Sequence, residues 1–119
     1  MLTKLSLNKN NSTEKLKNDI MNINETISKR AIEVHGVDSQ CEMIIEECLE
    51  LALALQKLKR KRGDPDEKLK NVIDEIADVN IMISQANRIF DAVKIQERID
   101  YKMNRLEKRL DEYVINKQI

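Results

Sequence analysis

The chain has very few residues that interrupt a helix. Its 119 residues include two glycines, Gly36 and Gly63, and one proline, Pro65. Glycine and proline are the strongest local breaks in regular structure, so few turns are expected and long helices should dominate. Helices joined by short links pack antiparallel with their neighbours. The sequence therefore predicts an all-α fold, an antiparallel bundle of about four helices.

Apolar spacing places these helices along the chain. Apolar residues that recur every three or four positions mark one face of a helix. On this basis we expect helices over about residues 14–34, 39–61, 67–90 and 91–116. The last of these has heptad-like spacing, which is typical of helices that pack along a common seam. Its apolar residues are Ile99, Met103, Leu106, Leu110 and Tyr113.

Two breaks separate the first three predicted helices. Gly36 suits a helix C-terminus, and Asp38 or Ser39 would cap the helix that follows. The Gly-Asp-Pro segment at residues 63–65 is the clearest turn in the chain. The second and third predicted helices should therefore be antiparallel partners.

The chain length fits one compact domain. We expect residues 12–119 to form a single helical domain, preceded by a flexible N-terminal segment at residues 1–11, which is polar and rich in asparagine. A domain of this size is only moderately able to bury a core by itself, so completion by oligomerisation is expected.

Composition argues against several classes of partner. The 21 basic and 21 acidic residues cancel, so there is no net charge to attract nucleic acid or an anionic membrane. Aromatic residues make up only 3%, which argues against base-stacking surfaces. The basic run at residues 57–62 lies at a predicted helix C-terminus and is interpreted as a solvated helix end.

The expected location is the cytoplasm. The longest purely apolar run, LALAL, is too short to span a bilayer, and no signal peptide is apparent. Cys41 and Cys48 are seven residues apart, about 10 Å along a helix, which is too far for a disulfide. We expect both to be reduced core residues of a soluble protein that binds neither membrane nor nucleic acid.

Acidic residues interrupt the apolar stretches of the second and third predicted helices. Glu46, Glu47 and Glu50 lie in MIIEECLELAL, and Glu75 and Asp78 lie in VIDEIADVNIMI. Residues three or four apart share a helix face, and across an antiparallel turn the two clusters would match in height within roughly one to two turns. Converging carboxylates repel one another, and a hard divalent cation such as Mg²⁺ relieves that repulsion.

Two other interpretations of these acids stay open. Acids at this spacing are common on solvated faces, although Glu46, Glu47, Glu75 and Asp78 all lack a basic residue four positions later. A di-iron carboxylate bundle would need Glu-x-x-His pairs from two helices. The one histidine, His35, lies in the first break, so di-iron is disfavoured.

EECLE followed by EIAD resembles the E-E-x-x-E … E-x-x-D signature of MazG-like, all-α nucleoside triphosphate pyrophosphatases. The resemblance covers about residues 38–110, and 24 residues separate Glu50 from Glu75. It implies a nucleotide pyrophosphohydrolase that converts an NTP or dNTP and water to NMP and pyrophosphate in nucleotide-pool house-cleaning. It also implies a homodimer or homotetramer of helical bundles.

The resemblance also implies roles for the five acids. By position in the signature, Glu47, Glu50, Glu75 and Asp78 would be ligands of Mg²⁺, with Mn²⁺ as a substitute. Glu46 would be a ligand through water, or a base that orients the attacking water. The catalytic residues expected in this way are Glu46 and Glu47.

A triphosphate also needs cations from the protein. Lys102 and Arg105 belong to a basic stripe that flanks the apolar positions of the fourth predicted helix, and we expect them to contact phosphate. The alternative is a solvated basic face that pairs with Asp100, Glu107 and Asp111.

Two polar residues are candidates for contact with the nucleobase. Asn80 could hydrogen-bond a base edge, and His35 could line the base pocket or shuttle a proton. The alternatives are a solvent-facing or subunit-contact amide and an ordinary loop-end histidine. The competing class of function is a non-catalytic helical oligomerisation or regulatory module, which the heptad-like fourth helix and the 35% of charged residues would suit.

Overall fold

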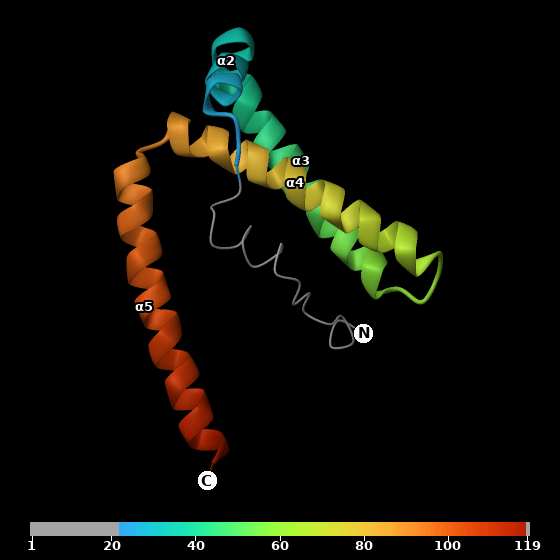
Figure 1. Ribbon diagram of the computed structural model, residues 1–119, viewed down its shortest axis with the longest axis vertical. Helices are drawn as coiled ribbons and strands as arrows, with labels where there is room; N and C mark the ends of the chain where they lie inside the picture. The colour runs from blue at the N-terminus through green and yellow to red at the C-terminus, as the bar shows by residue number, and fades with distance from the viewer. Residues whose placement is uncertain (1–21, 119) are drawn as a thin grey trace. The chain divides into compact units, whose positions relative to one another are not determined.

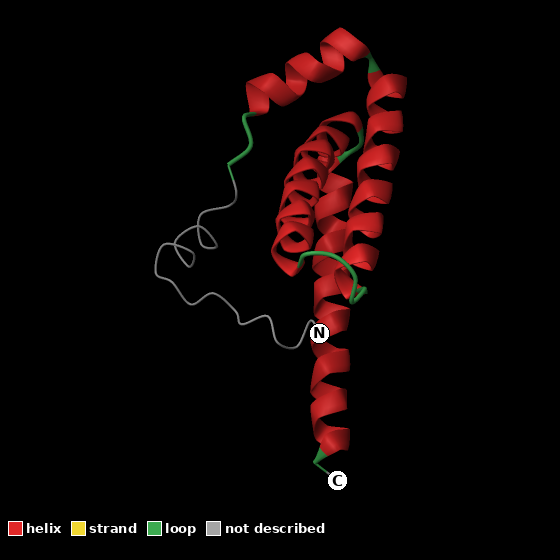
Figure 2. Cartoon of the chain, turned by 90° about the vertical axis from the view of Figure 1, so that its right-hand side faces the viewer, coloured by secondary structure: helices red, strands yellow, loops and turns green. Residues whose placement is uncertain are grey.

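The computed structural model describes residues 22–118, and over this range the chain forms helices and no strand (Figure 2). The helices are α2 (Glu25–His35), α3 (Val37–Lys59), α4 (Pro65–Ile89) and α5 (Ala92–Lys117) (Figure 1). The predicted all-α class is confirmed. None of the described helices is long and apolar enough to cross a bilayer. The predicted flexible segment at residues 1–11 lies outside the described residues.

Helix α2 begins later than predicted. Its N-cap is Asn24, whose side-chain oxygen accepts a hydrogen bond from the Ile27 backbone N–H at 3.1 Å. An N-cap residue has an extended backbone, so it starts a helix and cannot continue one. The prediction of one unbroken helix over residues 14–34 is therefore wrong at residues 22–24. The part of that prediction before residue 22 lies outside the described residues.

Gly36 alone separates α2 from α3. Its φ of 86° is a conformation that favours glycine, and its N–H donates to the Ile32 carbonyl at 2.8 Å, which closes α2 as expected. Helix α3 begins immediately afterwards at Val37, so the prediction of Asp38 or Ser39 as its N-cap is wrong. Asp38 instead lies in the first turn of α3, where a negative charge interacts favourably with the helix dipole.

A short turn joins α3 to α4. Gly63 adopts a φ of 85°, and the Asp64 side chain accepts a hydrogen bond from a backbone N–H in the first turn of α4 at 3.1 Å. The Lys68 ammonium donates to the Arg60 carbonyl across the turn. Pro65 is the first residue of α4, where its missing N–H leaves no helical hydrogen bond unmade. Helices α3 and α4 therefore run side by side and antiparallel, as Figures 1 and 2 show.

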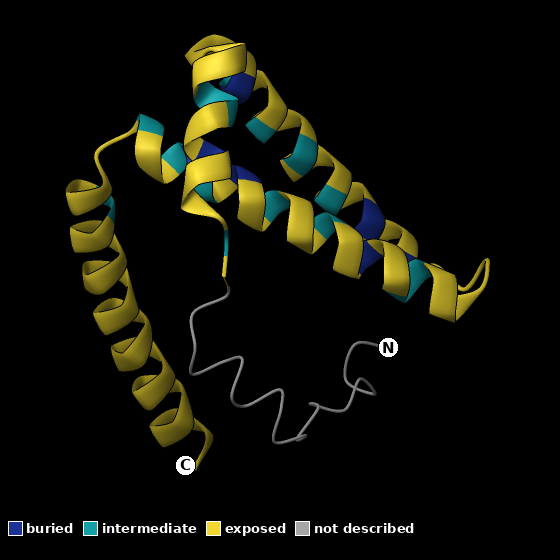
Figure 3. Ribbon diagram, turned by 45° about the horizontal axis from the view of Figure 1, so that its top comes forward, coloured by how far each residue is buried: buried dark blue, intermediate teal, exposed yellow. Residues whose placement is uncertain are grey.

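A small apolar core fixes the alignment of α3 with α4. Ala54 and Leu58 of α3 pack with Val72 of α4, and the half-buried Leu69 packs against them. Met82 is buried further along α4. Figure 3 shows buried positions where these helices face each other. This contact sets the register between the helices and so decides which of their acids can meet.

Large apolar side chains remain exposed on α3 and α4. Ten of them are between 37 and 65% exposed: Val37, Met43, Ile45, Leu49, Leu53, Leu55, Ile73, Ile76, Ile81 and Ile83. Apolar surface of this extent is typical of a contact with another chain. Cys48 is also exposed, so the prediction that it is a core residue is wrong, whereas Cys41 is half-buried.

The chain divides into two compact units, one ending at Ala86 and the other beginning at Asn87. The second unit holds the last residues of α4, the link, and α5. The Asp91 carboxylate caps α5 by accepting hydrogen bonds from the backbone N–H groups of Val93 and Lys94, both at 3.1 Å. The single helical domain over residues 12–119 stays a prediction.

Candidate metal centre

Carboxylates from α3 and α4 meet on the facing sides of the two helices. Glu47 of α3 and Glu75 and Asp78 of α4 each offer one carboxylate oxygen, and these oxygens all lie within 4.8 Å of one another. Glu75 and Asp78 are neighbours on one face of α4, because residues three apart lie about one turn from each other. The antiparallel pairing expected from the sequence therefore brings the two acidic clusters together. We call Glu47, Glu50, Glu75 and Asp78 the acidic cluster.

Two oxygens of the acidic cluster are buried and have no hydrogen-bond partner among residues 22–118. They are Oε2 of Glu47 and Oε2 of Glu75. Both residues are half-buried, whereas Asp78 is exposed. A buried carboxylate oxygen that receives no hydrogen bond is unfavourable, and a cation among the three side chains would give it a partner. Hard divalent ions such as Mg²⁺ prefer oxygen ligands, so the residues present fit such an ion.

The pKa of the Glu47 carboxyl is raised above its ordinary value of 4.5. Burial is the largest cause, because it disfavours the charged form. The negative charges of Glu50, Asp78 and Glu75 raise this pKa further, and Glu46 adds the smallest effect. Glu47 therefore lies in a negative field that a bound cation would neutralise.

The pKa of the Glu75 carboxyl is raised for related reasons. Burial is again the largest cause, followed by the charges of Glu50 and Asp78. A side-chain hydrogen bond with Glu50 raises this pKa as well, with a smaller contribution from Asp74. The interaction with Glu50 therefore favours the protonated form of Glu75. A bound cation would oppose these effects, because it favours the charged carboxylates.

The two remaining acids of α3 differ in their relation to the cluster. Glu50 is exposed, yet it acts on both half-buried glutamates and hydrogen-bonds one of them. It is not among the residues whose oxygens meet within 4.8 Å, so its role as a fourth ligand stays a prediction. Glu46 is exposed, and its charge is the smallest of the named causes that raise the pKa of Glu47. Its catalytic role stays a prediction.

The raised pKa values predict how the metal-free protein responds to pH. At a pH between the ordinary carboxyl value and the raised values, folded Glu47 and Glu75 hold protons that the unfolded chain releases. Their contribution to stability is therefore greatest below the ordinary value and is lost as the pH rises through the raised pKa values. As the pH rises through this range, we expect the melting temperature of wild type to fall relative to that of Glu75→Gln. Thermal unfolding followed by circular dichroism, in the presence of a chelator, measures this difference. A rise of the wild-type melting temperature relative to the variant would contradict the prediction.

The four residues expected to bind substrate are divided between the two compact units. Asn80 is exposed on α4, and its amide nitrogen donates to the Ile76 carbonyl of its own helix at 3.0 Å. His35 is exposed in the last turn of α2. Lys102 and Arg105 are exposed on α5, which belongs to the second unit. Their contact with substrate stays a prediction.

Several buried or half-buried polar side chains between α2, α3 and α4 were not predicted from the sequence. The Ser28 and Ser84 hydroxyls lie 3.3 Å apart and link α2 to α4, and the Gln40 amide donates to the Ala31 carbonyl at 3.3 Å, which links α3 to α2. Oε1 of Gln85 is buried and has no hydrogen-bond partner in the described part of the chain. The signal available in the sequence was the polar pair Ser-Gln at residues 84–85 within an apolar run.

No family model, curated protein or solved structure matches this chain. Its function is therefore inferred from the residues and their geometry.

Proposed function

We propose that the chain is a Mg²⁺-dependent nucleoside triphosphate pyrophosphohydrolase of the MazG-like, all-α type. The observation that carries this proposal is the meeting of Glu47, Glu75 and Asp78 from two helices, with two buried carboxylate oxygens left unpaired. The acids belong to EECLE and EIAD, the two parts of the signature noted in the sequence. The reaction would convert an NTP or dNTP and water to NMP and pyrophosphate, and Mn²⁺ would substitute for Mg²⁺.

The acidic cluster would hold the ion. When bound, Mg²⁺ would supply positive charge to the phosphate oxygens and polarise the attacking water. The chain contributes carboxylates that the helices hold together before the ion binds, so little rearrangement is needed. Glu47 would be a ligand of the ion, and the neighbouring Glu46, which is exposed, would accept a proton from the attacking water or orient it by a hydrogen bond.

Cationic and amide side chains would bind the remainder of the substrate. Lys102 and Arg105 would neutralise charge on the triphosphate. Asn80 and His35 would contact the base. A homodimer or homotetramer would cover the exposed apolar side chains of α3 and α4, because contact with another chain removes them from water.

Pyrophosphate release from a panel of canonical and modified NTPs and dNTPs tests the activity. We expect release only with Mg²⁺ or Mn²⁺, with the corresponding NMP as the second product. Formation of NDP and phosphate would contradict the proposed cleavage. The absence of pyrophosphate with every nucleotide and either metal would contradict the hydrolase itself.

A non-catalytic oligomerisation or regulatory module is the second candidate, favoured by the apolar heptad spacing of α5. Thermal unfolding separates the two candidates. A protein that binds metal and nucleotide gains stability by mass action, about 2.7 kcal/mol when the ligand is at 100 times its Kd. A melting temperature unchanged by Mg²⁺ with any nucleotide would favour the module.

A further inference from the structure

Helix α5 carries an apolar seam that nothing in its own unit covers. The described part of this unit consists of the last residues of α4, a short link and α5. The seam residues are between 41 and 59% exposed: Ile99, Met103, Leu106, Leu110 and Tyr113. Helices in proteins gain most of their stability by packing an apolar face, so this seam needs a second surface.

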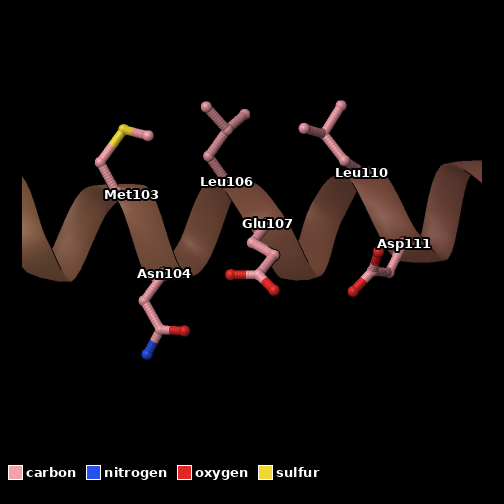
Figure 4. A pocket seen from close by; sticks show the side chains of 6 residues that line it. All are labelled: Met103, Asn104, Leu106, Glu107, Leu110 and Asp111. Atoms are coloured by element: carbon pink, nitrogen blue, oxygen red, sulfur yellow. The ribbon is translucent and has the colours of Figure 1, made fainter. Parts of the chain in front are cut away.

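The side chains of the seam form one row along the helix. In Figure 4, Met103, Leu106 and Leu110 project to the same side of α5, where they help to line a shallow surface pocket. The polar Asn104 and Glu107 project away from that row. Apolar and polar side chains are thus separated around the helix, as in helices that pair along a seam.

The seam fits a heptad repeat written abcdefg. Met103 and Leu110 occupy a positions, and Ile99, Leu106 and Tyr113 occupy d positions. Because the repeat averages 3.5 residues, two such helices can keep their seams in contact over this length by supercoiling. A second α5 therefore matches the seam in period and in length.

Charges flank the seam with opposite signs on its two sides. Lys102 and Arg109 occupy g positions, and Asp100 and Glu107 occupy e positions. In a parallel, in-register pair, each g residue faces the e residue five positions later on the other helix. Lys102 would then face Glu107 of the second copy, and symmetry repeats this attractive pair on the other side.

The antiparallel alternative places like charges together. Aligning the same apolar residues in an antiparallel pair makes g face g and e face e. Lys102 would face Arg109 of the second copy, and Asp100 would face Glu107 of the second copy. Such contacts are repulsive, so the charge pattern of α5 favours the parallel orientation.

We propose that α5 binds α5 of a second copy of this chain as a parallel, in-register coiled coil. Gln96 lies at the a position that begins the seam, where a polar residue fixes register. Its amide donates to Asp100 at 2.9 Å within the same helix. The pairing does not depend on hydrolase activity. A dimer built only through α3 and α4 would satisfy the proposed oligomer and contradict this pairing.

Disulfide trapping in the full chain tests orientation and register. With Cys41 and Cys48 replaced by serine, Gln96→Cys places a thiol in the seam, and the matched control Lys94→Cys places one on the outer f position. In the parallel pair the two thiols at position 96 meet, whereas in the antiparallel pair they lie at opposite ends. Under mild oxidation we expect the dimer to form at least about tenfold faster from Gln96→Cys. Equal rates, or no dimer from Gln96→Cys, would overturn the proposal.

Charge reversal in the full-length chain tests the pairing itself. Lys102→Glu and Glu107→Lys should each weaken self-association roughly tenfold in sedimentation equilibrium, because each reverses two symmetric pairs. The double variant, and an equimolar mixture of the two single variants, should restore it.

Residues near Lys102 and Glu107 in the same helix cannot cause the expected loss of self-association. Lys102 lies near Arg98 and Arg105, and Glu107 lies near Asp111, so each reversal relieves repulsion inside its own helix. A loss of association must therefore come from the other copy. Stronger association of Lys102→Glu would indicate the antiparallel pair. Unchanged association of the single variants, or a monomeric wild type at every concentration, would also overturn the proposal.

Discussion

Glu47→Gln is expected to lower Mg²⁺-dependent pyrophosphate release at least about 100-fold, since loss of even a supporting group around a metal costs 10 to 100-fold. The same change should raise the melting temperature of the metal-free protein. Glutamine keeps the size of the side chain and removes its charge from a site where Glu50, Asp78 and Glu75 all disfavour it. Loss of activity with gain of stability is the signature of a charge that serves binding.

The matched control for this prediction is Glu42→Gln. Glu42 is exposed on α3, and the change alters the charge of the same helix by the same amount away from the acidic cluster. We expect activity and the Mg²⁺-dependent thermal shift to persist in the control and to disappear in Glu47→Gln. Full activity of Glu47→Gln, with helix content unchanged by circular dichroism, would show that Glu47 is no metal ligand.

Leu58→Ala is expected to destabilise the helical unit by about 2 to 5 kcal/mol, the range for replacing a buried leucine with alanine. Leu58 is only 8% exposed and belongs to the cluster in which Ala54, Val72 and Leu69 join α3 to α4. Domains of this size have a net stability of about 5 to 15 kcal/mol, so the loss is a large fraction of the total. Urea unfolding followed by circular dichroism, at one protein concentration, measures it.

Leu53→Ala makes the same chemical change on the exposed side of α3, where Leu53 is 49% exposed. In dilute protein it should cost less than about 1 kcal/mol, as most surface changes do. If a second copy covers this face, the cost should grow with protein concentration, whereas the cost of Leu58→Ala should be present even in dilute protein. Equal costs for the two variants in dilute protein would contradict the described core.

Much of the local structure followed from the sequence. Two glycines and one proline predicted long helices, and the described residues form them. The meeting of Glu47 with Glu75 and Asp78 also followed from the sequence. A short turn makes the two helices antiparallel, and a constant rise per residue then places their acids at similar heights.

The positions at which helices begin and end depend on individual residues and not on the apolar spacing. Asn24 starts a helix inside a stretch whose apolar spacing predicts continuity, because its side chain accepts the Ile27 N–H. Gly36 alone serves as the link between α2 and α3, so α3 starts before the residues expected to cap it. Apolar spacing reports a face and its period, and it does not locate the residue at which a helix begins.

The sequence by itself determined the helical class, the antiparallel α3 and α4, and the acids that these helices bring face to face. Only the tertiary structure decided which of the described carboxylate oxygens are buried and unpaired, that Glu50 raises the pKa of Glu75, and that the Ser28 and Ser84 hydroxyls meet. The reason is physical. Helical periodicity depends on residues a few positions apart, whereas burial and pKa values depend on side chains that the fold brings from distant parts of the chain.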